Sequence, residues 1–100
     1  MFSVYILYST SSDKYYVGCT NDIIRRLDEH NLSERVTYTL KHRPWILKKS
    51  IVISTERSLA MRYEHAIKKS KSRKILKTII LEVNTVKELA QLVRVPISRD

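Results

Sequence analysis

The first twenty residues contain two short segments in which apolar and polar side chains alternate. Phe2 to Tyr8 and Lys14 to Gly18 are rich in aromatic and β-branched residues, which is typical of strands. Between them, residues 9–12 are four hydroxyl side chains in a row, which favours a turn. The pattern therefore predicts a β-hairpin at the start of the chain.

The predicted hairpin places two tyrosines on one face. If Tyr8 pairs with Asp13, the antiparallel register puts Tyr5 opposite Tyr16, and opposed residues share a face of the sheet. Gly18, the single glycine of the chain, then ends the second strand. A chain that uses glycine once has a steric reason for it, and we expect a tight turn from strand into helix there.

Three apolar stripes at helical spacing follow the hairpin and predict helices. The first helix is capped by Thr20 or Asn21 and the second by Ser54 or Thr55. The last begins at a capping box that Thr85 opens. The inward residues are, in order, Ile23, Ile24 and Leu27; Leu59, Tyr63, Ala66 and Ile67; and Val86, Leu89, Ala90 and Val93.

The remaining segments are less periodic. Residues 31–43 are polar without a clear period and predict a loop, whereas Trp45 to Ile53 predicts one strand that a bulge can interrupt. Lys68 to Lys77 mixes six cations with anchoring apolar residues and predicts a helix with a basic face. A length of 100 residues without repeats or linkers predicts a single domain, 1–100, of mixed α and β structure.

Charge suggests the kind of partner. The chain has 19 Lys and Arg against 10 Asp and Glu, a formal net charge of +9. Such a charge attracts polyanions through long-range steering and counterion release, which favours a nucleic-acid partner. The alternative is a basic surface that only keeps the protein soluble.

The single cysteine and the lack of long apolar runs suggest the compartment. Cys19 alone can form neither an internal disulfide nor a structural zinc site, which favours a reducing, cytoplasmic location. The first ten residues lack the features of a signal peptide, and no apolar run is long enough to cross a membrane. We expect a soluble cytoplasmic protein without membrane contacts.

Four residues near the hairpin are candidates for phosphodiester chemistry. The phenols of Tyr5 and Tyr16 can handle a proton if their pKa falls well below about ten. Arg26 can grip phosphate, and His30 lies four residues later on the same helical face and titrates near neutrality. The alternatives are tyrosines that only pack and an arginine and histidine on a solvated face.

A lone carboxylate and a set of cations complete the candidates. Glu64 stands among basic residues and could hold a divalent cation, although the residues alone favour an ion pair with Lys68 at i, i+4. The cations of the basic run are candidates for contacts to a nucleic-acid backbone, with a solvated face as the alternative. The candidate nucleic-acid contacts are Arg25, Lys68, Lys69, Lys71, Arg73 and Lys74. Trp45 is expected in the core, and His42 and His65 on the surface.

Taken in order, these segments resemble a known family. Ser3-Val4-Tyr5, Tyr16-Val17-Gly18 and the helix over residues 20–31 resemble the GIY-YIG nuclease domain. Residues 57–69 look like the later helix of that domain. The resemblance covers residues 2–93 and is greatest to the small stand-alone bacterial members. It implies an α+β fold with a small three-stranded antiparallel sheet flanked by helices.

The resemblance also implies an activity and roles. It implies an endonuclease that cleaves DNA with one divalent cation, Mg²⁺ or Mn²⁺, with branched or damaged DNA and DNA repair as candidate settings. The motif tyrosines map to Tyr5 and Tyr16, and the catalytic arginine and a nearby histidine map to Arg26 and His30. The metal-binding glutamate maps to Glu64. Of the two phenols, Tyr5 is the expected base, with Tyr16 and His30 as positioning groups.

Departures from the family pattern keep other functions open. Ser3 replaces the first motif glycine, Cys19 stands where some members have lysine, and Asn84 lies too far beyond Glu64 to match the downstream asparagine of the family. A non-catalytic nucleic-acid-binding module with the same fold is therefore the alternative. A protein partner that supplies specificity is a third hypothesis, because little chain remains outside the catalytic fold.

Overall fold

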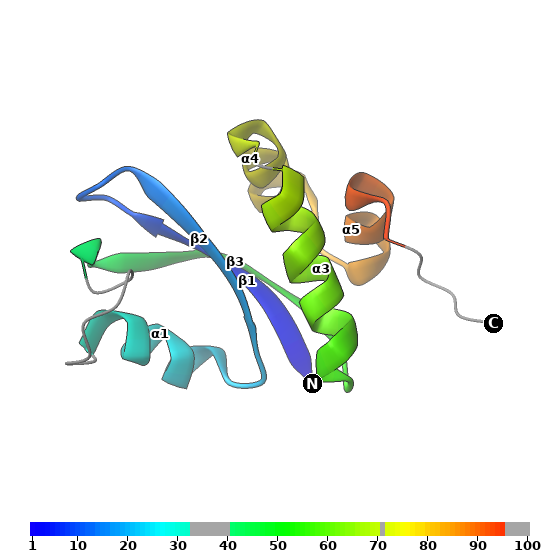
Figure 1. The fold of residues 1–100 in the computed structure, drawn as a ribbon, viewed down its shortest axis with the longest axis horizontal. Coiled ribbons are helices and arrows are strands. Elements are labelled where there is room, and N and C mark those ends of the chain that lie inside the picture. The colour runs from blue at the N-terminus through cyan, green and yellow to red at the C-terminus, as the bar shows by residue number, and fades with distance from the viewer. Residues whose placement is uncertain (33–40, 71, 96–100) are drawn as a thin grey trace.

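The computed structural model describes residues 1–32, 41–70 and 72–95. In these ranges three antiparallel strands form one sheet of order β2-β1-β3, and four helices flank it (Figure 1). The strands are β1 (Phe2–Ser9), β2 (Lys14–Thr20) and β3 (Trp45–Ser54), and the helices are α1 (Ile23–Leu32), α3 (Arg57–Ser70), α4 (Arg73–Glu82) and α5 (Val86–Val93). The α+β fold with a small three-stranded sheet is thus confirmed.

Helices cover both faces of the sheet. Helix α1 lies on one face, and α3, α4 and α5 lie on the other (Figure 1). Alternation along β1 sends Val4 and Ile6 into the core with the three helices, and Tyr5 and Leu7 into a smaller core under α1. Because β1 is the central strand, all four of these side chains are buried. Trp45 is buried in the smaller core, as the sequence predicts.

The hairpin register differs by two residues from the predicted one. Tyr5 pairs with Gly18, and Tyr16 pairs with Leu7, so the predicted pairing of the two tyrosines is wrong. The turn closes one residue later than predicted, with Asp13 at a left-handed φ of 54°. Because a shift of two residues preserves the alternation, both tyrosines still lie on the same face, as predicted.

The reason for the single glycine is the ring of a cross-strand neighbour. A Cβ at Gly18 would lie 2.4 Å from Oη and 2.6 Å from Cζ of Tyr5. Gly18 has no positive φ and lies inside β2, two residues before its end. The expected steric reason exists, but the expected tight turn at this position is wrong, because the constraint comes from the Tyr5 ring that covers the glycine.

The start of α1 differs in detail from the prediction. Asp22 caps the helix, rather than Thr20 or Asn21, because its carboxylate accepts a hydrogen bond from the Arg25 amide at 3.1 Å and its carbonyl one from Arg26 at 3.0 Å. The hydroxyl of Thr20 instead accepts a bond from the Asp22 amide at 3.1 Å. Thus Arg25 and Arg26 belong to the first turn of α1.

The loop predicted over residues 31–43 is wrong at its first two residues, which are helical. Asn31 and Leu32 still belong to α1, and residues 33–40 lie outside the described residues. The bulged strand is confirmed, because the pairing of β3 with β1 shifts between Phe2 and Ser3 and again between Ile6 and Leu7.

The basic run falls on two helices, so the prediction of one helix is wrong. α3 ends at Ser70, and Ser72 caps α4 by accepting a hydrogen bond from the Ile75 amide at 3.2 Å. Lys71 lies outside the described residues. The capping box at Thr85 is confirmed with both reciprocal bonds. Over the described ranges, no helix is both long and apolar enough to cross a membrane.

Candidate active site

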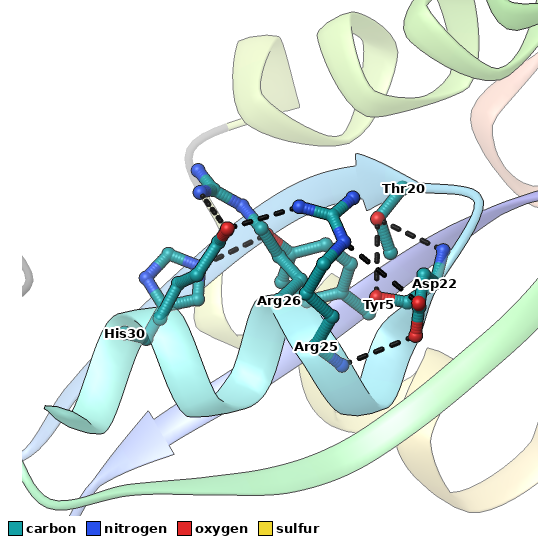
Figure 2. Close-up of polar contacts among 7 residues, drawn as sticks. Tyr5, Thr20, Asp22, Arg25, Arg26 and His30 are labelled. Carbon is teal, nitrogen blue, oxygen red and sulfur yellow. Dashed lines mark hydrogen bonds and ion pairs between the residues drawn. The ribbon is translucent and has the colours of Figure 1, made fainter. Parts of the chain in front are cut away.

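The hydroxyl of Tyr5 joins the central strand to α1. Tyr5 is only 1% exposed, and its Oη accepts a hydrogen bond from Arg26 Nε at 3.3 Å and lies 3.0 Å from His30 Nε2 (Figure 2). The two partners lie one turn apart on the face of α1 that covers the sheet. The predicted grouping of Tyr5, Arg26 and His30 is therefore present in the fold.

The environment keeps His30 neutral. Its side chain is buried, and burial together with the neighbouring Arg26 charge lowers the pKa of His30 to about 4. Arg26 can only donate, so we assign the Tyr5 hydroxyl hydrogen to the bond with His30 Nε2. The imidazole then carries its own proton on Nδ1. Near neutral pH, His30 acts as a hydrogen-bond acceptor that orients Tyr5.

Burial makes Tyr5 a poor base. It raises the pKa of Tyr5 to about 12, although the hydrogen bond from Arg26 opposes the shift. A phenol that removes a proton from water needs a pKa well below ten and access to the water. The geometry therefore disfavours the expectation that Tyr5 is the base, because a ring that packs on Gly18 is sealed from solvent.

Tyr16 occupies the half-buried border of the same cluster. Its ring packs edge-on against the His30 ring, with the centroids 4.8 Å apart, and lies 6.4 Å from the Tyr5 ring. Lys68 Nζ lies 5.5 Å from the centre of the Tyr16 ring. The Tyr16 hydroxyl has no hydrogen-bond partner among the described residues. It is the phenol that a bound molecule can reach.

Arg26 keeps its charge at this place. Its Nη1 donates to Glu29 at 2.9 Å and its Nε to Tyr5. Burial opposes the charged form, but the hydrogen bonds to Glu29 and Tyr5 outweigh it and raise the pKa of Arg26. The side chain is 38% exposed, so a cationic guanidinium faces solvent beside the two tyrosines.

Glu64 reaches the cluster from α3, on the other side of the edge strand β2. Its Oε2 accepts a hydrogen bond from Lys68 Nζ at 2.7 Å, which is the ion pair that the i, i+4 spacing allows. Burial and a hydrogen bond to Glu64 raise the pKa of the Cys19 thiol. Lys68 thus links Glu64 to the ring of Tyr16, and the five predicted site residues form one connected group.

A cavity borders the cluster, but most of the predicted site residues do not line it. A cavity of about 390 Å³ lies beside the cluster, and of the five predicted residues only Arg26 lines it. Arg57 also lines it, a residue that the sequence patterns alone did not single out. Its position seven residues before Glu64, two helical turns on the same face, was the available signal.

Several predicted nucleic-acid contacts already have partners. Arg73 forms two hydrogen bonds to the Asp13 carboxylate, at 2.7 and 3.2 Å, and its guanidinium lies 5.0 Å from the centre of the Tyr15 ring. Arg25 is paired with Glu29 at 2.9 Å. Arg73 therefore holds the hairpin turn against α4, and these two arginines are less available to a ligand than the sequence suggests.

The other candidates differ in exposure. Lys69 and Lys74 are exposed, with no ion pair within the described ranges. His65 is exposed, whereas His42 is only half-exposed, and its Nδ1 lies 2.8 Å from the Ser12 hydroxyl. His42 thus has a polar partner, Ser12, that the sequence did not indicate.

The amino-acid sequence of this chain is similar to those of known proteins. The chain matches the GIY-YIG catalytic domain over residues 1–90, a range that includes the hairpin, α1 and Glu64. A UPF0213 protein of Halobacterium salinarum is 37% identical over 68 residues, which cover 68% of this chain and 86% of that protein. The chain belongs to the GIY-YIG family.

Proposed function

We propose that this protein is an endonuclease that hydrolyses phosphodiester bonds of DNA with the aid of a divalent cation. One observation carries the proposal: Arg26, Tyr5, His30 and Tyr16 form a connected chain of contacts, with the cationic Arg26 partly exposed and the Tyr16 hydroxyl free among the described residues. Membership of the GIY-YIG family supports a nuclease-type fold. The formal net charge of +9 supports an anionic substrate.

Tyr16 is the phenol that serves the attacking water. Its hydroxyl has no partner among the described residues, so in its phenolate form it can accept a hydrogen bond from the water and take its proton while the new P–O bond forms and the P–O bond to the leaving oxygen breaks. Tyr5 instead accepts from Arg26 and donates to His30, which positions both. This division of roles reverses the one expected from the resemblance, because only Tyr16 combines access with a free hydroxyl.

Arg26 stabilises the charge that develops on the phosphate. Its Nε is held by Tyr5 and its Nη1 by Glu29, and its Nη2 has no partner among the described residues. A guanidinium held at two nitrogens loses little conformational freedom when the third binds a phosphate oxygen. Such preorganised positive charge usually contributes more to catalysis of this type than any other single effect.

The residues present fit a magnesium-like cation. Within the described residues, no three His, Cys, Asp or Glu side chains gather into a metal site, so Glu64 stands as a single carboxylate. Mg²⁺ commonly binds to one or two carboxylates together with water and substrate phosphate, and Mn²⁺ accepts the same ligands. The Lys68 ammonium already occupies the position of a cation beside Glu64. When bound, the metal would polarise the phosphate and stabilise the leaving oxygen.

A nicking assay tests the proposal. We expect the wild-type protein with Mg²⁺ or Mn²⁺ to cleave DNA in a panel of plasmid, flap and junction substrates. Arg26→Ala should reduce the rate by about 10²–10³-fold, because it removes charge stabilisation of the transition state. Arg62→Ala, which removes an equal charge from an exposed position of α3, should leave the rate unchanged.

Two variants of the carboxylates complete the test. Glu64→Gln should abolish cleavage but retain DNA binding in EDTA, whereas Glu82→Gln at an exposed position of α4 should cleave normally. Binding to DNA without cleavage of any substrate would contradict the proposal and favour a non-catalytic binding module. Equal activity of Glu64→Gln and the wild type would also contradict it.

A further inference from the structure

A polar cavity of about 390 Å³ lies between α1 and the beginning of α3. Three arginines line it, Arg25 and Arg26 from α1 and Arg57 from α3. Glu29 is the one carboxylate of its lining, so the lining has an excess of positive charge. A cavity of this composition favours an anionic ligand rich in oxygen.

The cavity is continuous with the candidate active site. Arg26 lines it and also contacts Tyr5, and Cys19 lines it and is near enough to Glu64 for that carboxylate to raise the pKa of the Cys19 thiol, after the larger effect of burial. Arg57 precedes Glu64 by two turns of the same helix face. An extended phosphodiester chain that places one phosphate between Arg26 and Glu64 would therefore place a neighbouring phosphate in this cavity.

Arg57 is the available cation of the cavity. Glu29 accepts hydrogen bonds from both Arg25 and Arg26, each at 2.9 Å, whereas Arg57 has no ion pair within the described ranges. Arg57 lines the cavity together with Cys19. Figure 2 shows Arg25 and Arg26 extending side by side from α1 toward the same carboxylate.

We propose that this cavity binds a phosphate adjacent to the scissile phosphate of DNA, with Arg57 as its principal ligand. The assignment rests on the proposed nuclease function and deepens it, because it defines the path of the cleaved strand from α1 toward the beginning of α3. A backbone contact of this kind aligns the substrate without reading its sequence.

A larger groove of about 490 Å³ under the hairpin turn is a weaker candidate. Its arginine, Arg73, already has its charge satisfied by two bonds to Asp13, and Lys68, which also lines it, is paired with Glu64. A phosphate there would have to displace both ion pairs. The cavity at Arg57 requires no such displacement.

The test compares two arginines of one helix. Binding of Arg57→Gln and Arg62→Gln to a fluorescent DNA flap is measured in EDTA, where no cleavage occurs, over a series of salt concentrations. The logarithm of the DNA-binding constant falls as the logarithm of the salt concentration rises. If Arg57 contacts a phosphate, its replacement should make this slope shallower by about 0.9, the contribution of one phosphate. Arg62→Gln, also exposed on α3, should keep the wild-type slope. Both variants should unfold at the wild-type urea concentration.

A second measurement places the contact. The wild-type cleavage position is mapped, and single phosphates on either side are replaced with neutral methylphosphonate. At one phosphate adjacent to the cut, methylphosphonate should weaken DNA binding by the wild type. The same DNA should bind Arg57→Gln no more weakly than unmodified DNA does, since that variant has already lost the contact.

The outcomes separate the two proposals. Equal salt slopes for Arg57→Gln and Arg62→Gln would overturn the phosphate site. So would losses of binding affinity that add up for Arg57→Gln and methylphosphonate at each adjacent phosphate. In both cases, DNA cleavage by the wild type would leave the proposed nuclease function intact. If the wild type binds DNA but cleaves no substrate, the proposed function fails, and the proposed subsite beside the scissile phosphate fails with it. The salt slopes would then report only whether Arg57 contacts DNA.

Discussion

Tyr5 and Tyr16 share a sheet face but differ in their surroundings. Tyr5 lies on the central strand, covered by α1, with its hydroxyl bonded to Arg26 and His30. Tyr16 lies on an edge strand, is half-exposed, and keeps its hydroxyl free among the described residues. The Tyr5 hydroxyl therefore serves the structure through its two hydrogen bonds, whereas the Tyr16 hydroxyl is accessible to a substrate.

Replacement of each tyrosine by phenylalanine should separate these two roles. Tyr5→Phe should lower the free energy of unfolding by about 1–3 kcal/mol, because it leaves the buried His30 Nε2 without its partner. Tyr16→Phe should abolish nicking and change stability by less than about 0.5 kcal/mol. Urea denaturation and the nicking assay measure both effects. Full activity of Tyr16→Phe would contradict its assignment as the group that serves water.

Gly18 is expected to tolerate no side chain while Tyr5 is present. Gly18→Ala should destabilise the fold by about 1–3 kcal/mol, because its Cβ overlaps the Tyr5 ring, and the urea midpoint should fall at an unchanged m-value. In a Tyr5→Ala background, which removes the ring, the same substitution should cost much less. An equal cost in both backgrounds would show that the ring is not the reason for the glycine.

At the scale of elements, two adjacent lysines at the end of α3 point in different directions. Lys68 is directed toward Glu64 and the ring of Tyr16, whereas Lys69 is exposed and without an ion pair among the described residues. The successive positions point about 100° apart around a helix, so neighbouring cations have different roles. A basic run in the sequence is therefore not a single binding surface.

The two lysines should respond differently when their charge is removed. Lys68→Gln should lower the Mn²⁺ concentration for half-maximal nicking by roughly 1.4- to fivefold, since an exposed ion pair that competes for Glu64 is worth about 0.2–1 kcal/mol. Lys69→Gln should leave that concentration unchanged. The measurement uses saturating DNA, so that weaker substrate binding does not mimic the effect. Identical midpoints for the two variants would show that Lys68 does not compete with the metal.

At the scale of the whole molecule, the packing of helices on both faces of the sheet links a residue of the candidate site to the stability of the fold. His30 is buried between α1 and the sheet, and its pKa of about 4 lies below the ordinary value of 6.5. The unfolded chain therefore binds the proton first as the pH falls. The stability contributed by neutral His30 is complete above pH 6.5 and is lost between pH 6.5 and about 4.

A stability profile against pH tests this coupling. We expect the free energy of unfolding to fall by about 3 kcal/mol over that window, because the pKa of His30 differs by about 2.5 between the unfolded and folded chain. His30→Gln, which takes up no proton, should flatten the profile there. Glu29, whose pKa the bond from Arg26 lowers, adds its own loss only below about pH 4.5. An unchanged slope in His30→Gln would place the acid sensitivity elsewhere.

Much of the fold and part of the site could be predicted from local patterns. The strands, the stripes of the helices and the Thr85 capping box depend on residues within a few positions of one another. The structure confirms them apart from Ile24, which the first stripe places inward and which is 74% exposed. The placement of Arg26 and His30 on one helical face also follows from a spacing of four. The order of the motifs was sufficient to indicate the family, because each motif is itself a local segment.

Only the tertiary structure decided the features that join distant residues. The two-residue shift of register brings Gly18 opposite Tyr5, whose ring packs on it, and burial raises the pKa of Tyr5 so that its phenol stays protonated. The neighbourhood of Arg57 and Arg26 depends on how α1 and α3 meet around the edge strand. The sequence by itself determined which side chains each element could present. Packing between elements determined which were buried, which were paired and which stayed open to a ligand, because burial and electrostatic contact are set by neighbours distant along the chain.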